Sequence, residues 1–92
     1  MTINKKYNIG MLQINARIEP GFVVLLTNIP NVTKGIYEAA KRNGDDVEWK
    51  ERVQACIQHY KGKSEKEIEI IVDADVIKAT KDAKNIFGAM RK

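Results

Sequence analysis

Apolar and polar residues alternate without interruption from Leu12 to Glu19. A period of two is typical of a strand with one buried face, so this stretch predicts a strand. Pro20 and Gly21 follow as a turn pair, because proline fixes its own φ angle and glycine tolerates unusual ones. Residues 22–27 are apolar on both faces and predict a central second strand. Together these segments predict an N-terminal hairpin.

The residues before this hairpin are apolar in the opposite phase, at Tyr7, Ile9 and Met11. Gly10 lies where the phase changes. A bulge or bend at a glycine would join the two halves into one long strand, and this is the arrangement that we expect.

Two helices are predicted after the hairpin. The first runs from Asn31 or Thr33, as the N-cap, to Gly44, where a glycine is expected to end a helix. Its apolar stripe recurs at helical spacing. The second helix is predicted over residues 45–62, with one apolar face made of Trp49, Val53, Cys56, Ile57 and Tyr60.

Residues 64–73 return to alternation and predict a third strand, with Ile68, Ile70 and Val72 facing inward. A last helix, capped by Asp73 or Asp75, is then predicted to run to about Met90. Its stripe consists of Val76, Thr80, Ala83, Phe87 and Met90. The predicted order of elements is therefore β-β-α-α-β-α.

This order predicts an α+β fold, a small two-layer sandwich in which helices cover one face of a three-stranded sheet. One face of the second strand then lies in water, which is unfavourable by about 25 cal/mol per Å² of apolar surface. The alternatives are helices on both faces or a second molecule on the open face. We expect an interface at Phe22, Val24 and Leu26, filled by another copy of the chain or by a different protein.

Length and composition limit the class of protein. The chain has 92 residues, 43% of them hydrophobic and 30% charged, which predicts one globular domain over residues 1–92. The longest apolar run, residues 22–26, is too short to cross a membrane, and no apolar signal segment follows the N-terminus. A single cysteine, Cys56, excludes an internal disulfide. We therefore expect a cytoplasmic protein.

The net charge of +4 comes from the N-terminal half of the sequence. A basic excess favours anionic partners, so we consider DNA or RNA binding through this half. The ordinary alternative is solvated charge on exposed faces. The candidate residues for binding nucleic acid or another anion are Lys5, Lys6, Arg17, Lys34, Tyr37, Lys41 and Arg42.

Asp73 and Asp75 follow an apolar run, and two carboxylates at a strand end can share Mg²⁺. Residues 70–76 resemble the first motif of haloacid-dehalogenase-type phosphatases, and the resemblance is limited to these seven residues. It implies a small metal-dependent enzyme. The alternative is an exposed strand end followed by a helix cap, which requires no metal.

The rest of the sequence favours a non-catalytic protein. It contains one histidine and one cysteine, and Cys56 lies in a predicted apolar face, where a thiol is inert. No set of residues indicates a catalytic triad or a cofactor. We therefore predict a small interaction protein, a regulator, inhibitor or assembly factor, that binds a protein partner through an apolar sheet surface. Nucleic-acid binding is the alternative, and a metal-dependent enzyme is the third possibility.

Overall fold

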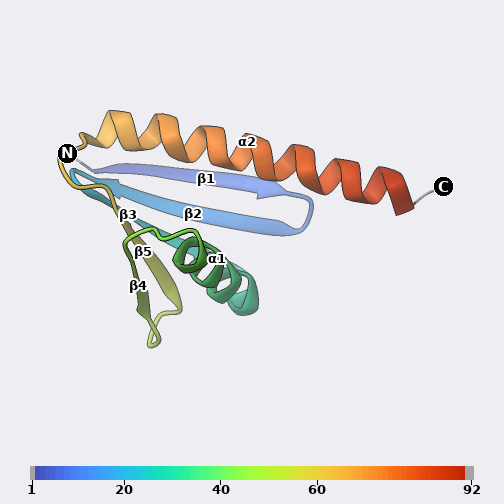
Figure 1. Cartoon of the computed structure of the whole chain (residues 1–92), viewed down its shortest axis with the longest axis horizontal. Coiled ribbons are helices and arrows are strands. Elements are labelled where there is room, and N and C mark those ends of the chain that lie inside the picture. Colours follow the sequence, from blue (N-terminus) through green and yellow to red (C-terminus); the bar gives the residue numbers. More distant parts are fainter. Residues whose placement is uncertain (1, 91–92) are drawn as a thin grey trace.

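The fold is a five-stranded antiparallel sheet with two helices, in the order β-β-β-α-β-β-α (Figure 1). The computed structural model describes the backbone of residues 2–90 and the side chains of residues 2–81. The elements are β1 (Ile3–Ile9), β2 (Leu12–Glu19), β3 (Phe22–Thr27), α1 (Pro30–Arg42), β4 (Val47–Lys50), β5 (Ala55–His59) and α2 (Glu65–Met90). The three-stranded sheet and the β-β-α-α-β-α order predicted from the sequence are therefore wrong.

The strands lie in the order β1-β2-β3-β5-β4, and every neighbouring pair is antiparallel. The hairpin predicted over residues 12–27 is present, with Gly21 at a φ of 91° in its turn. Residues 3–9 form a separate strand, which pairs with β2 from Ile3↔Ile18 to Ile9↔Leu12. The change of phase at Gly10 (φ 61°) is thus a tight turn between two strands, and the predicted bulge is wrong.

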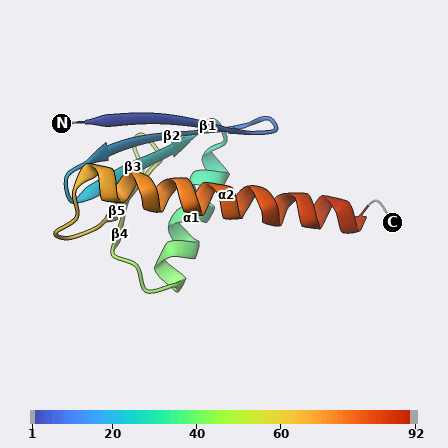
Figure 2. The same ribbon diagram turned by 90° about the horizontal axis from the view of Figure 1, so that it is seen from above.

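The two faces of the sheet differ, and we call the one that both helices contact the inner face. Alternate residues of β2 and β3, with Cys56 of β5, form its buried core. Ile68 and Val72 of α2 pack into this core, while α1 packs against β3, β4 and β5. Figure 2 shows that α2 runs over the sheet and continues beyond the turn between β1 and β2. The opposite side of the sheet is called the outer face.

Helix α1 begins at Pro30, so neither Asn31 nor Thr33 is its N-cap. Thr33 instead faces the sheet and is fully buried. Its hydroxyl oxygen accepts the backbone N–H of Thr27 at 3.0 Å, which joins the helix to the end of β3. Gly44, with a φ of 83°, follows the C-cap residue and ends the helix as predicted.

Residues 45–62 form a hairpin instead of the predicted helix. Val47 and Trp49 of β4 face inward and alternate with exposed Glu48 and Lys50. β5 pairs with β3 over residues 22–25 and thereby satisfies backbone groups that a helix would have left open at that sheet edge. Val53, assigned to the apolar stripe, is 56% exposed in the turn of this hairpin.

Residues 65–73 of the predicted third strand belong to α2 instead. Ser64 precedes α2, and its hydroxyl oxygen accepts the backbone N–H of Glu67 at 3.3 Å, as in a helix capping box. Ile68 is fully buried and Ile70 is 69% exposed. In the predicted strand both side chains would face inward and would be buried to a similar degree. Of the stripe predicted for the last helix, Ala83, Phe87 and Met90 lie outside the described side chains.

Candidate protein-binding face of the sheet

The outer face carries an apolar strip across the centre of the sheet. Phe22, Val24 and Leu26 alternate along β3 on this side, and the register pairs Val24 with Ile57 of β5. The three β3 residues are half-buried, and Ile57 is 7% exposed. These four residues are called the apolar strip. Among residues 2–90, both helices lie on the other face, so no helix covers it.

Charged side chains of both signs surround the strip. Phe22, Val24 and Ile57 of the strip line a shallow hollow of about 340 Å³, with Arg17, Glu19, Glu48 and Lys50 at its rim. Arg17 lies 3.2 Å from the Glu19 carboxylate. A hydrogen bond from the Thr2 hydroxyl to Glu19, together with Arg17, lowers the pKa of this carboxyl group. The Glu19 carboxyl group is therefore ionised at neutral pH, and the rim contains two acidic and two basic side chains.

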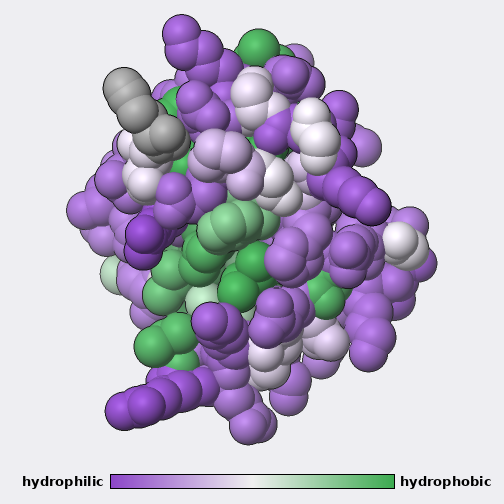
Figure 3. All heavy atoms as spheres, turned by 90° about the vertical axis from the view of Figure 1, so that its left-hand side faces the viewer, coloured by the Kyte–Doolittle hydropathy of each residue, from purple (hydrophilic) through white to green (hydrophobic). Residues whose placement is uncertain are grey.

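His59 completes one end of this hollow. Its Nε2 lies 3.7 Å from the Glu48 carboxylate, and its ring lies 6.3 Å from the ring of Phe22, centroid to centroid. Figure 3 views the molecule from the side of β4 and β5 that faces away from α1. Hydrophobic residues gather in the middle of this view, and hydrophilic residues surround them.

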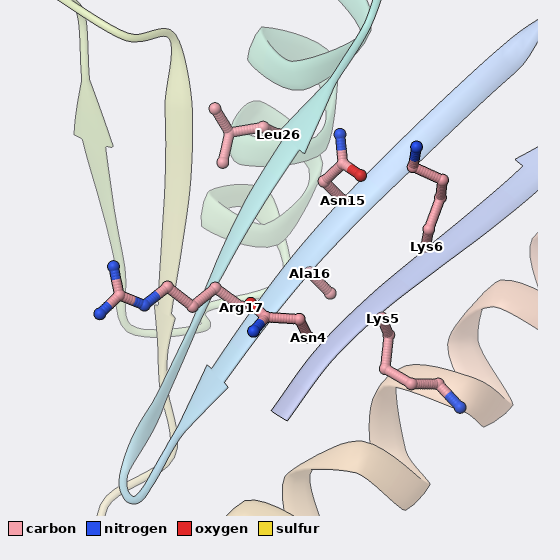
Figure 4. A pocket seen from close by; sticks show the side chains of 7 residues that line it. All are labelled: Asn4, Lys5, Lys6, Asn15, Ala16, Arg17 and Leu26. Carbon is pink, nitrogen blue, oxygen red and sulfur yellow. The ribbon is translucent and has the colours of Figure 1, made fainter. Parts of the chain in front are cut away.

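The part of the outer face over β1 and β2 is polar. A second hollow of about 250 Å³ lies there, beside the end of the apolar strip at Leu26. Figure 4 shows Lys6, Asn15 and Arg17 around this hollow, while the Lys5 side chain extends toward α2. The apolar strip is thus bordered by amide and ammonium groups on one side.

The predicted nucleic-acid residues are divided among separate surfaces. Lys5 lies on the inner face, with its Nζ 3.7 Å from both Glu69 and Asp73 of α2. Lys34, Lys41 and Arg42 are exposed on α1. Tyr37 packs beside Trp49, at a ring distance of 5.7 Å, with Lys41 over its ring. Only Lys6 and Arg17 of the predicted set lie on the outer face.

The structure does not bring the carboxylates of Asp73 and Asp75 together. Asp73 accepts a hydrogen bond from the hydroxyl of Tyr7 on β1, and burial together with this bond raises the pKa of Tyr7. Asp75 lines a pocket on the other side of α2. Both residues lie within the helix, so the strand end on which the predicted metal site depended is absent. Within the described residues, no three metal-ligating side chains lie close enough to hold an ion.

The environment of Asp75 gives a pH-dependent prediction. Burial and the nearby Asp45 raise the pKa of Asp75, and Lys78 opposes this shift. As pH rises above the ordinary value for aspartate, the unfolded chain therefore loses this proton before the folded chain, and stability falls. We expect Asp75→Asn to raise the melting temperature at pH 7 and to leave it unchanged near pH 3. A lower melting temperature for the variant at pH 7 would contradict this account.

Comparison with known proteins gives no relative for this chain: no family model matches it, and neither does any curated protein or solved structure. Within the described residues, neither helix has the length and apolarity that crossing a membrane requires. The cytoplasmic location stays a prediction from the sequence.

Several residues of the candidate site were not found from the sequence. Ile57, His59, Glu48 and Lys50 reach the outer face because residues 45–62 form a hairpin. A signal was present, since Val47 to Lys50 alternate apolar and charged residues in the way that a strand does. The helical spacing of Trp49, Val53 and Cys56 obscured it.

Proposed function

We propose that this protein is a non-catalytic interaction protein that binds a second copy of itself through the outer face of its sheet. The observation that carries this proposal is the apolar strip, which lies in the middle of the sheet and is left open by both helices. A sheet buries its apolar face against another layer, and two sheets can pack face to face about 10 Å apart. A second sheet of the same kind would supply that layer.

The charges around the strip favour a second copy as the partner. A two-fold interface brings the same patch of both molecules together, so the patch must complement itself. Arg17 and Lys50 supply two positive charges at the rim, and Glu19 and Glu48 supply two negative ones. With opposite signs at the rim of each molecule, two copies can meet without a net repulsion.

The positions of the basic residues argue against nucleic acid as the partner. Binding to a phosphate backbone depends on clustered Lys and Arg side chains. Here Lys5 already faces two carboxylates, and the three basic residues of α1 extend from a different element. The residues predicted to bind nucleic acid therefore do not form one basic surface.

The mass of the purified, nuclease-treated protein in solution tests the proposal. We expect light scattering to give twice the monomer mass of 10.4 kDa. Because the contact is mainly apolar, this mass should change little between low and moderate salt, whereas a complex with nucleic acid would weaken steeply. A monomer at all concentrations would contradict the proposal, and a monomer that purifies with nucleic acid would favour the alternative.

A further inference from the structure

The inner face of the sheet contains a pocket between the two helices. In the described part of the chain, α1 packs against β3, β4 and β5, α2 packs against β1, β2 and β3, and the backbones of the two helices do not come close to each other. The sheet surface between them is therefore not fully covered. The pocket that results has a volume of about 190 Å³ and lies on the opposite side of the sheet from the apolar strip.

The walls of this pocket are mostly apolar. Ile14 and Leu25 of the sheet form its floor, Ile36 of α1 forms one wall, and Val72, Val76 and Ala79 of α2 form the other. The floor residues are at most 9% exposed, so the pocket reaches down to the core. An apolar group of a few carbon atoms would replace water there favourably.

The polar groups of the pocket are an amide and a carboxylate, supplied by Gln58 and Asp75. The Gln58 amide donates a hydrogen bond to Asp45 at 3.2 Å, so that group already has a partner. The carboxylate of Asp75 makes no ion pair within 4.0 Å and no side-chain hydrogen bond among the described residues. Asp45 adds a second negative charge nearby, and Lys78 is the cation close to Asp75.

Tyr60 lies near the same two carboxylates. Burial, followed by the charges of Asp75 and Asp45, raises the pKa of its hydroxyl to about 12. The Tyr60 side chain is therefore neutral at pH 7 and adds no charge to this end of the pocket. Among the described residues, the acidic end consequently has two carboxylates and one lysine, with a net negative charge.

We propose that this pocket binds a small organic amine with an apolar body, with the ammonium group on Asp75. The apolar walls accept the hydrocarbon part, and the Asp75 carboxylate, which has no partner among the described side chains, offers a charge-assisted hydrogen bond to the ammonium group. A carboxylic acid of the same shape would meet repulsion from Asp75 and Asp45. This inference does not depend on the outer face or on the association of two copies.

Three probes of matched shape test the proposal: cyclohexylmethylamine, cyclohexylmethanol and cyclohexanecarboxylate. Titrated into the full-length protein, the amine should shift the amide NMR signals of Leu25, Ile36 and Ala79. For a ligand of this size we expect a dissociation constant on the order of 1 mM. The alcohol should bind about fivefold more weakly, because its hydrogen bond to the carboxylate carries no charge on the donor. The carboxylate probe should bind more weakly still.

Two variants and one control variant show which residues of the pocket the binding of the probes depends on. Asp75→Asn should reduce the affinity for the amine to that for the alcohol, while the alcohol binds as before. Ala79→Leu places a larger side chain at an exposed position of the wall and should abolish binding of all three probes. Glu67→Gln removes a negative charge from the same helix away from the pocket and should change nothing. Equal binding of amine and alcohol by the unaltered protein, or an equal effect of Glu67→Gln and Asp75→Asn, would overturn the proposal.

Discussion

Replacing Ile68 by alanine is expected to lower the free energy of unfolding by about 3 kcal/mol. The same replacement at Ile70, two residues along α2, is expected to change it by less than about 0.5 kcal/mol. Ile68 is fully buried in the core against the inner face, whereas Ile70 is 69% exposed on the opposite side of the helix. The pair thus compares one residue type in one element at two degrees of burial.

Chemical denaturation of the two variants, followed by circular dichroism, provides the measurement. The comparison also distinguishes the helix from the strand predicted for residues 64–73, in which Ile68, Ile70 and Val72 would share one buried face. Similar losses at Ile68 and Ile70 would support that strand and contradict the position of α2. A loss confined to Ile68 is the result that the structure requires.

Replacing Val24 by glutamate is expected to weaken self-association by at least about 100-fold, because an unpaired carboxylate in a closed interface costs several kcal/mol. Val24 lies at the centre of the apolar strip and is only half-buried in a single molecule. The variant should therefore fold as a monomer. Sedimentation equilibrium over a range of concentrations measures the change in the dissociation constant.

Ile70→Glu is the matched control for this substitution. Ile70 is 69% exposed on α2, which covers the inner face, and it does not line the hollow around the strip. The substitution introduces the same charge on the opposite side of the sheet from the proposed contact and should leave the dimer intact. If Val24→Glu proves unfolded, Val24→Thr gives a smaller polar change at the same position. Dimers of unchanged affinity in folded Val24 variants would exclude the strip as the interface.

The elements that could be predicted from the sequence are those specified by neighbouring residues. The hairpin over residues 12–27 combines uninterrupted alternation with a Pro-Gly turn, and α1 ends at a glycine with positive φ. Residues 45–62 have apolar residues at both helical and strand spacing. Whether they form a helix or a hairpin depends on β3, which is distant in sequence and requires a hydrogen-bonding partner along its second edge. The spacing within the segment does not contain this information.

The segment over residues 64–73 was misassigned for a different reason. Acidic residues alternate with isoleucine and valine there, and this alternation outweighed two helical signals in the same sequence. Ser64 and Glu67 have the spacing of a capping box, and Ile68, Val72 and Val76 recur every four residues. Ile71 would lie on the polar side of the predicted strand, which also conflicts with the alternation. The helical interpretation was therefore available from the sequence.

The candidate site also combines residues that the local sequence pattern indicates with residues that depend on the order of strands. Phe22, Val24 and Leu26 could be identified because a strand that is apolar on both sides indicates a second buried face. Ile57, the fourth residue of the strip, and Lys50 at its rim could not be identified, because only the order of strands in the sheet brings them next to β3. The grouping of basic residues in the N-terminal half gave no guide to their positions in space, since Lys5 and Lys6 point to opposite faces of β1.

The most direct test of the proposed self-association is an isotope-filtered NMR experiment on a mixture of ¹³C-labelled and unlabelled protein. Only contacts between different molecules give signals in this experiment. We predict contacts from the labelled methyl groups of Val24 and Leu26 to the unlabelled ring of Phe22. A dimer that instead shows contacts from Ile70 and Ile77 on the exposed side of α2 would contradict the account, because the apolar strip would then remain open in the assembled protein.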